Sequence, residues 1–139
     1  FSGDHVVDAA PSLVQFGRND HLLDHFLNTF PRLKAMDFET VFMSHHEPLY
    51  GADHIDAFYE YMIGKFKKPL AKRMEIINQL ETATAKEVAQ RSHGAFDELE
   101  FGMRVRRIAM TFSYLEYLAD KGQINREEDA QGVFHYSLI

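Results

Sequence analysis

Hydrophobic residues in the first third of this chain recur at intervals of three and four, which is the spacing of an amphipathic helix. Asn19 or Asp20 can cap such a helix, and Pro31 is expected to kink or end it. The apolar positions that define the helix are Leu22, Leu23, Phe26, Leu27 and Phe30. The run at residues 40–43 is rich in β-prone side chains instead, and it predicts one short buried strand that ends in a loop.

A second apolar pattern predicts a helical region that begins near Asp53 and reaches Leu80. Gly64 and Pro69 interrupt this region, so we expect two helices rather than one. The apolar stripe of the first helix consists of Ile55, Phe58, Tyr59, Met62, Ile63 and Phe66.

A capping box is predicted where Thr84 precedes Glu87 by three positions, with a short helix following to about Arg91. Residues 92–102 are expected to form a loop. The apolar anchors of this loop are expected to be Phe96, Leu99 and Phe101.

The longest predicted helix runs from Met103 to Lys121, with Gly122 as its stop signal. Residues 123–125 and 132–138 flank an acidic, polar turn and predict a hairpin. A winged helix-turn-helix unit has the same order of elements: a helix, a short helix, a long helix and a hairpin.

Charge divides the chain at about the place where the pattern changes. Residues 1–64 hold three basic and ten acidic residues, a net charge of −7, whereas residues 65–139 hold twelve basic and eleven acidic residues, a net charge of +1. We therefore expect two structural units, residues 1–64 and residues 65–139, in a predominantly helical α+β fold. The overall charge of −6 disfavours a general affinity for nucleic acid.

Composition is that of a soluble globular protein, with 45% hydrophobic and 26% charged residues. Cysteine is absent, which excludes disulfides and thiolate metal sites. The sequence contains no apolar run of the roughly 18 residues that a membrane span needs and no signal peptide, so a cytoplasmic location is the default expectation. Because the chain does not begin with Met, we expect a processed, trimmed or truncated product.

Eight histidines raise the question of a metal site. His21 and His25, four positions apart, could share one helix face, but no third ligand is in reach and a solvated face is the simpler interpretation. Two other segments place acids or imidazoles where a strand becomes a loop: Gly3-Asp4-His5 and Ser44-His45-His46. Such junctions commonly present functional side chains from a rigid scaffold.

These two segments also carry a resemblance to the metallo-β-lactamase superfamily. Residues 1–7 resemble the strand that delivers a Gly-Asp pair in that superfamily, and residues 19–27 resemble the helix that follows. Residues 33–37 are similar to the turn before the next strand, and residues 41–49 to the strand with its Pro-Gly-His-Gly-x-Pro turn.

The resemblance continues along residues 73–80, 84–89 and 111–122, which are similar to a winged-helix-like C-terminal extension found in one branch of the superfamily. It implies the truncated back half of an αββα metallo-β-lactamase sandwich, followed by a winged-helix-like helical domain. The individual motifs are short, and it is their order and spacing that carry the comparison.

By this resemblance, Asp4 corresponds to the carboxylate that bridges two metals, and His45 to the imidazole that completes the second metal site. His5 and His46 would lie beside the site, and His46 competes with His45 for the ligand position, although the register favours His45. The implied cofactors are two divalent metals, with zinc as the first expectation, and a carboxylate and a neutral imidazole suit that ion. Metal-bound hydroxide would attack an ester, thioester, amide, lactone or phosphodiester of a small-molecule substrate.

This sequence departs from the superfamily pattern because the His-x-His-x-Asp-His motif is absent from it. Residues 20–25 resemble that motif only superficially, since Asp and Leu stand where its first two histidines belong. With two protein ligands instead of three or four, the chain alone is expected to bind metal weakly and to hydrolyse nothing.

Two alternatives remain open. The first is a winged-helix module that binds nucleic acid, although its predicted wing at residues 126–129 is mostly acidic. The second is a structural or dimerisation module, for which exposed strand edges and apolar patches would favour a homo-oligomer. The basic residues that motivate the first alternative are Lys65, Lys67, Lys68, Lys72, Arg73, Arg104, Arg106 and Arg107.

Overall fold

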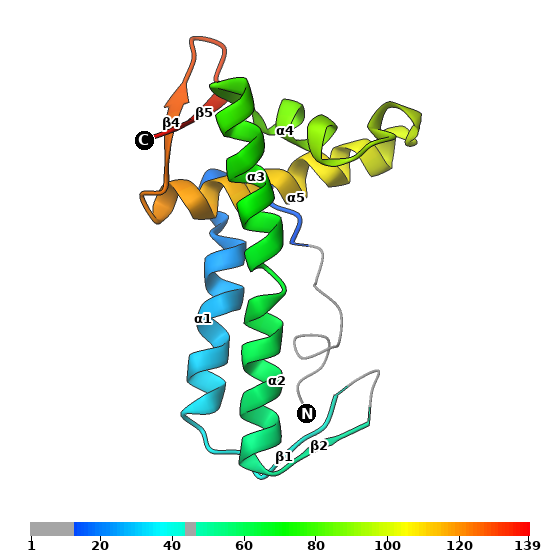
Figure 1. Cartoon of the computed structure of the whole chain (residues 1–139), viewed down its shortest axis with the longest axis vertical. Helices are drawn as coiled ribbons and strands as arrows, with labels where there is room; N and C mark the ends of the chain where they lie inside the picture. The colour runs from blue at the N-terminus through cyan, green and yellow to red at the C-terminus, as the bar shows by residue number, and fades with distance from the viewer. Residues whose placement is uncertain (1–12, 44–46) are drawn as a thin grey trace. The chain divides into compact units, whose positions relative to one another are not determined.

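The computed structural model describes residues 13–43 and 47–139, which divide into two compact units. The first unit spans residues 25–68, and the second combines residues 13–24 with residues 69–139. Helices dominate both units and the sheets are small, so the predicted predominantly helical α+β class is confirmed (Figure 1). No helix of the described ranges is long and apolar enough to cross a bilayer.

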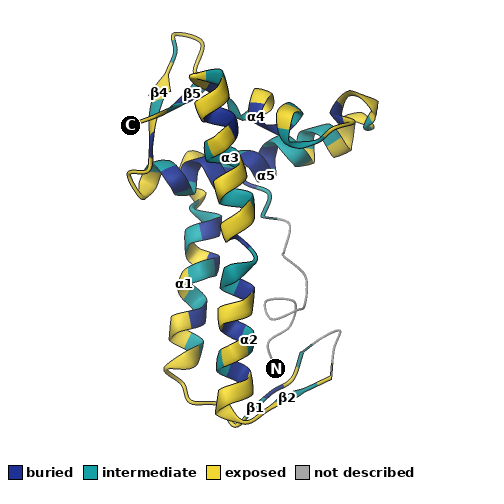
Figure 2. Cartoon of the chain, in the orientation of Figure 1, coloured by how far each residue is buried: buried dark blue, intermediate teal, exposed yellow. Residues whose placement is uncertain are grey.

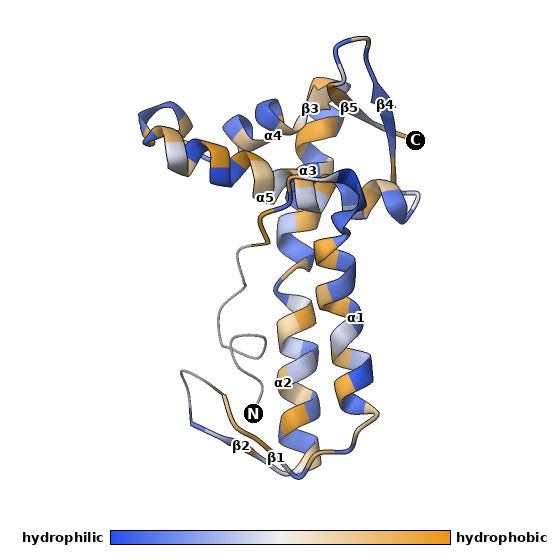
Figure 3. Cartoon of the chain, turned by 180° about the vertical axis from the view of Figure 1, so that it is seen from behind, coloured by the Kyte–Doolittle hydropathy of each residue, from blue (hydrophilic) through white to orange (hydrophobic). Residues whose placement is uncertain are grey.

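The first unit is built around helices α1 (Leu22–Lys34) and α2 (Ala52–Gly64), both of which were predicted from their apolar spacing. Hydrophobic and hydrophilic positions alternate around both helices, as Figure 3 shows. Aromatic rings form the core: the Phe26 centroid lies 5.1 Å from that of Phe30 and 5.5 Å from that of Phe66. The Phe30 ring lies 5.6 Å from that of Tyr59, which is almost fully buried. Tyr59 of α2 and Phe66 beyond its end therefore contribute to the core of this unit.

The start of α1 differs from the sequence prediction. Asn19 and Asp20 do not cap it, because they belong to a 3₁₀ turn in which Asp20 Oδ2 accepts from the Gly17 amide at 2.9 Å. The backbone amide of Leu22 instead donates to the buried Gln15 side chain at 3.3 Å. A glutamine seven residues away supplies this contact, and local capping rules do not anticipate it.

Pro31 does not end α1, which continues to Lys34. A proline removes one hydrogen bond to the preceding turn, but near the end of a helix the chain loses only that one contact. The amide of Ala35 still donates to the Pro31 carbonyl at 3.1 Å and closes the last turn.

The predicted strand at residues 40–43 is shorter than expected. Strand β1 is limited to Thr40–Val41 and pairs antiparallel with β2 (Leu49–Tyr50), a strand that was predicted to be loop. Of the two residues of β1, Val41 is buried, whereas Phe42 beyond it is 43% exposed. The prediction of a buried four-residue strand was therefore wrong in length.

The second unit contains helices α3 (Lys67–Leu80), α4 (Ala85–Ser92) and α5 (Phe101–Asp120). Its sheet consists of β3 (Thr82–Thr84), β4 (Ile124–Glu128) and β5 (Phe134–Leu138), in the order β3-β5-β4 with antiparallel pairing. The hairpin of β4 and β5 was predicted, but β3 was not. The core joins α3, α4, α5 and the sheet through Ile76, Ile77, Ala83, Val88, Leu115, Leu118, Ile124 and Tyr136.

Helix α5 begins at Phe101, two residues before its predicted start, and Phe101 is 75% exposed rather than an anchor. Phe96 does anchor the preceding segment, as predicted, because it is only 5% exposed. The helix stops as expected at Gly122, whose φ of 64° lies in the left-handed region. The amide of Gln123 donates back to the Leu118 carbonyl at 2.9 Å and completes this end.

The capping box of α4 is present as predicted. The Thr84 amide donates to Glu87 Oε2 at 2.7 Å, and the Glu87 amide donates to Thr84 Oγ1 at 3.3 Å. The Thr84 amide, together with the Thr84 hydroxyl that donates to the same carboxylate oxygen at 2.8 Å, holds the pKa of the Glu87 carboxyl below its ordinary value of 4.5.

We expect Thr84→Ala to lower the free energy of unfolding by about 1 kcal/mol, as for other N-cap residues. Because the folded-state pKa of Glu87 is depressed, its contribution is complete above about pH 4.5 and declines as the pH falls through the folded value. Urea unfolding at pH 7 and pH 3 checks both points. If Thr84→Ala lowers the free energy of unfolding by the same amount at pH 3 as at pH 7, the assigned role of Glu87 is contradicted.

Candidate functional site

The residues predicted to bind metal lie outside the described ranges. Asp4 and His5 precede residue 13, and His45 and His46 fall between residues 43 and 47, so their assignment stays a prediction. Strand β1 ends at Val41 and β2 begins at Leu49, so the segment that carries both histidines connects two paired strands. Within residues 13–43 and 47–139, no group of three or more His, Asp or Glu side chains could hold a metal ion.

His21 and His25 do not share a helix face. His21 precedes α1 with a φ of 45°, and its Nδ1 lies 2.7 Å from Asp120 Oδ2 on α5. Asp24, between the two histidines, pairs with Lys121 at 2.6 Å. These contacts join the segment before α1 to the end of α5, so the predicted helix face shared by the two histidines is wrong.

The second unit contains a buried polar cluster centred on Glu116, whose side chain is essentially inaccessible to water. Tyr136 Oη donates to Glu116 Oε1 at 2.8 Å, and Arg126 Nη1 donates to Glu116 Oε2 at 2.6 Å. Arg126 also lies 3.6 Å from Asp120 Oδ1, the carboxylate that contacts His21. Both oxygens of the buried carboxylate therefore have donors, as buried charges require.

Strand register explains why these side chains meet. Arg126 and Tyr136 are directly opposed across β4 and β5, which places both side chains on one face of the sheet. Burial, and then the charge of Glu116, raise the pKa of the Tyr136 hydroxyl. Tyr136 therefore stays protonated and acts as a hydrogen-bond donor, and the cluster joins α5 to the sheet.

The sequence prediction missed this cluster. It assigned no role to Glu116 or Tyr136 and placed Arg126 in the predicted wing. A usable signal was present, because an acid stands within the apolar run of α5 and an arginine and a tyrosine follow in the hairpin.

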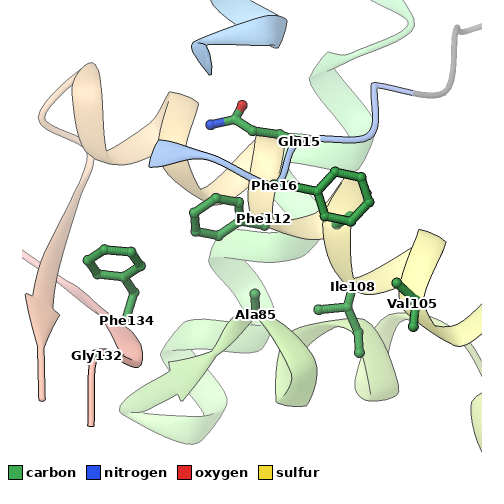
Figure 4. Close-up of a pocket in the computed structure, with 9 residues that line it drawn as sticks. Gln15, Phe16, Ala85, Val105, Ile108, Phe112, Gly132 and Phe134 are labelled. Atoms are coloured by element: carbon green, nitrogen blue, oxygen red, sulfur yellow. The ribbon is translucent and has the colours of Figure 1, made fainter. Parts of the chain in front are cut away.

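A largely apolar cavity of about 370 Å³ also lies in the second unit. Figure 4 shows Val105, Ile108 and Phe112 of α5 lining it together with Phe16 and Phe134. Its polar lining side chain, Gln15, is engaged already, since its Nε2 donates to the Gly17 carbonyl at 2.8 Å. Among the described residues that line this cavity none is titratable, so they can hold apolar groups but supply no acid, base or nucleophile.

The nucleic-acid hypothesis predicts that the long helix presents a solvent-facing surface. In α5, however, no residue from Arg107 to Ala119 is exposed, and the second half of the helix is mostly buried (Figure 2). The tip of the hairpin is organised by an acid, since Asp129 Oδ1 accepts from the amides of Gln131 and Val133 at 2.9 Å. The second half of α5 and the tip of the hairpin therefore lack the basic, open surface that contacts a phosphate backbone.

No family model matches the sequence, and no curated protein matches it. Solved structures do share its fold. A metallo-β-lactamase family protein from Thermus thermophilus superposes with a TM-score of 0.71 at 18% sequence identity, covering 99% of this chain and 40% of that protein. A β-lactamase domain protein from Burkholderia ambifaria gives a TM-score of 0.74 at 19% identity, again covering 99% of this chain and 40% of that protein.

At these identities the likeness is one of fold. The chain has the fold of part of these metallo-β-lactamase proteins and spans about 40% of the length of each. The fold resemblance inferred from the sequence is thus confirmed at this level.

Proposed function

We propose that this chain is the C-terminal portion of a metal-dependent hydrolase with the metallo-β-lactamase fold, called the parent enzyme below. The observation that supports the proposal best is the superposition of 99% of the chain on proteins of that family. The sequence supports it independently, because the segments around Asp4 and His45 resemble two ligand-bearing turns of the same superfamily.

Asp4 and His45 are the metal ligands that this chain would contribute, with His5 and His46 beside them. A carboxylate with two oxygens can join two cations, and a neutral imidazole is a common zinc ligand, so the donor types fit. The donor types favour zinc as the metal. Two such ions would lower the pKa of a bound water and polarise the scissile group of a small-molecule ester, thioester, amide, lactone or phosphodiester. The role of Asp4 is to offset the repulsion between the cations, and that of His45 is to complete one coordination shell.

We also propose that residues 65–139 form a winged-helix-like domain. The element order α3-β3-α4-α5-β4-β5 and the sheet order β3-β5-β4 support it, since a helical trio followed by a hairpin is the pattern of that motif. Because the second half of α5 is buried, a structural role for this domain is favoured over recognition of a nucleic-acid groove.

Metal binding provides the direct test. We expect zinc titration of the 139-residue chain by calorimetry to show no tight site, because stable zinc sites use three or four protein ligands. In the parent enzyme, bound zinc should approach two ions, His45→Ala should lower this content, and His46→Ala should leave it unchanged.

The two histidine variants are matched, since each removes one imidazole from the same segment. Equal zinc content in both variants and in the unsubstituted parent enzyme would refute the assignment of His45. Tight zinc binding by the 139-residue chain would show that the ligand set proposed here is incomplete.

A further inference from the structure

Three arginines and a histidine lie on neighbouring elements of the second unit. Arg73 belongs to α3, His93 follows the end of α4, and Arg104 and Arg107 occupy successive turns of one face of α5. The Arg73 guanidinium lies 4.5 Å from the centroid of the Tyr114 ring, which follows Arg107 by two turns on the same face of the helix. The three helices thus bring these side chains together.

The charges of this cluster also act on the pKa values of its members. Burial lowers the pKa of Arg73, and the charge of Arg107 adds to this effect. Burial also lowers the pKa of His93, with further contributions from Arg107 and Arg73. No carboxylate contributes to either shift.

The positive charge of the cluster has no counterpart in the described part of the chain. Across residues 13–43 and 47–139, no acidic side chain forms an ion pair with Arg73, Arg104 or Arg107. The Nε atom of each of the three arginines is buried without a hydrogen-bond partner.

We propose that Arg73, His93, Arg104 and Arg107 form a binding site for a phosphoryl group. Guanidinium groups bind phosphate through pairs of parallel N–H···O hydrogen bonds, and a dianion neutralises more than one of them at once. The four side chains are only partly buried. The site lies wholly within residues 69–139 and does not depend on the proposed hydrolase activity.

Calorimetry with inorganic phosphate, in a phosphate-free buffer of low ionic strength, tests the proposal on the 139-residue chain. We expect saturable binding that Arg107→Gln weakens by about tenfold or more, the scale of one lost charge-assisted pair. Arg106→Gln is the matched control, because it removes the same charge from the neighbouring, exposed position of α5 and should change the affinity little. The phosphate affinity of Arg107→Lys should fall between those of wild type and Arg107→Gln, since lysine keeps the charge but lacks the paired N–H donors of the guanidinium.

A second measurement reports on the site even if a variant binds too weakly for calorimetry. The His93 ring resonance, assigned by its loss in His93→Gln, should titrate at higher pH when phosphate is bound, because an anion favours the protonated imidazole. At a phosphate concentration near the wild-type Kd, the effect of phosphate on this resonance should be much smaller in Arg107→Gln, while urea unfolding verifies that the variant is folded.

A single-stranded RNA oligonucleotide distinguishes the possible sources of the phosphoryl group. If RNA binds more tightly than inorganic phosphate and is displaced by it, the ligand is a polynucleotide backbone; if it binds no more tightly, the ligand is a small phosphorylated molecule. The proposal is refuted if the wild-type chain binds neither probe saturably, or if Arg106→Gln weakens binding as much as Arg107→Gln.

Discussion

Replacement of Glu116 by alanine is expected to lower the free energy of unfolding of the chain by at least about 3 kcal/mol, the loss typical of removing one partner of a buried ion pair. Arg126, whose side chain is only 17% exposed, would lose its contact at 2.6 Å and keep only the longer approach to Asp120. The Tyr136 hydroxyl would lose its acceptor inside the core. A single substitution would thus remove the acceptor of a buried hydroxyl and the main partner of a largely buried guanidinium.

Urea unfolding of wild type, Glu116→Ala and Glu127→Ala measures this effect. Glu127 is the matched control because it is exposed on β4, where a lone surface acid contributes about 0.5 kcal/mol or less. Glu116→Gln should fall between the other two, since an amide still accepts a hydrogen bond but no longer neutralises Arg126. A Glu116→Ala variant as stable as Glu127→Ala would contradict a structural role for the cluster.

Local signals predicted the helices of this chain well. The Thr84–Glu87 capping box and the Gly122 stop are determined by residues within one helical turn, and the structure contains both where the sequence placed them. Apolar periodicity located α1, α2, α3 and α5 for the same reason, because one buried face repeats every three or four residues.

Features that depend on distant partners were predicted less well. Strand β3 has three residues, and its pairing with β5 joins Ala83 to Tyr136, more than fifty positions apart. The N-terminal amide of α1 is satisfied by Gln15 rather than by the adjacent Asn19 or Asp20, because a buried amide side chain was available from another turn. Neither pairing has a signature within a short window of sequence.

The same distinction applies to the candidate sites. Asp4 and His45 were proposed from a resemblance to short turns, whereas the Glu116 cluster and the arginine cluster require α5 to meet a hairpin or two other helices. An acid inside an apolar helix hints at a buried partner, but only the fold identifies Arg126 and Tyr136 as that partner.

Substitution of Asp4 by alanine in the parent enzyme is expected to lower kcat/KM by about a thousandfold or more, which corresponds to ~4 kcal/mol of transition-state stabilisation. A carboxylate between two cations reduces their repulsion, and without it the site would lose metal as well as the acidity of the bound water. Asp4→Asn tests the effect of charge at nearly constant side-chain shape, because the amide retains one oxygen that can bind a metal and loses the negative charge. We expect its activity to lie nearer to that of the alanine variant than to wild type.

Activity and zinc content must be measured together for this prediction. Asp8→Ala is the matched control, since it removes an acid from the same segment at a position to which the superfamily resemblance gives no role. If Asp4→Ala loses both zinc and turnover while Asp8→Ala keeps both, the carboxylate acts as a ligand. If Asp4→Ala keeps wild-type turnover and zinc, Asp4 is not part of the metal site, and the sequence comparison that aligned it with the bridging carboxylate is wrong at that position.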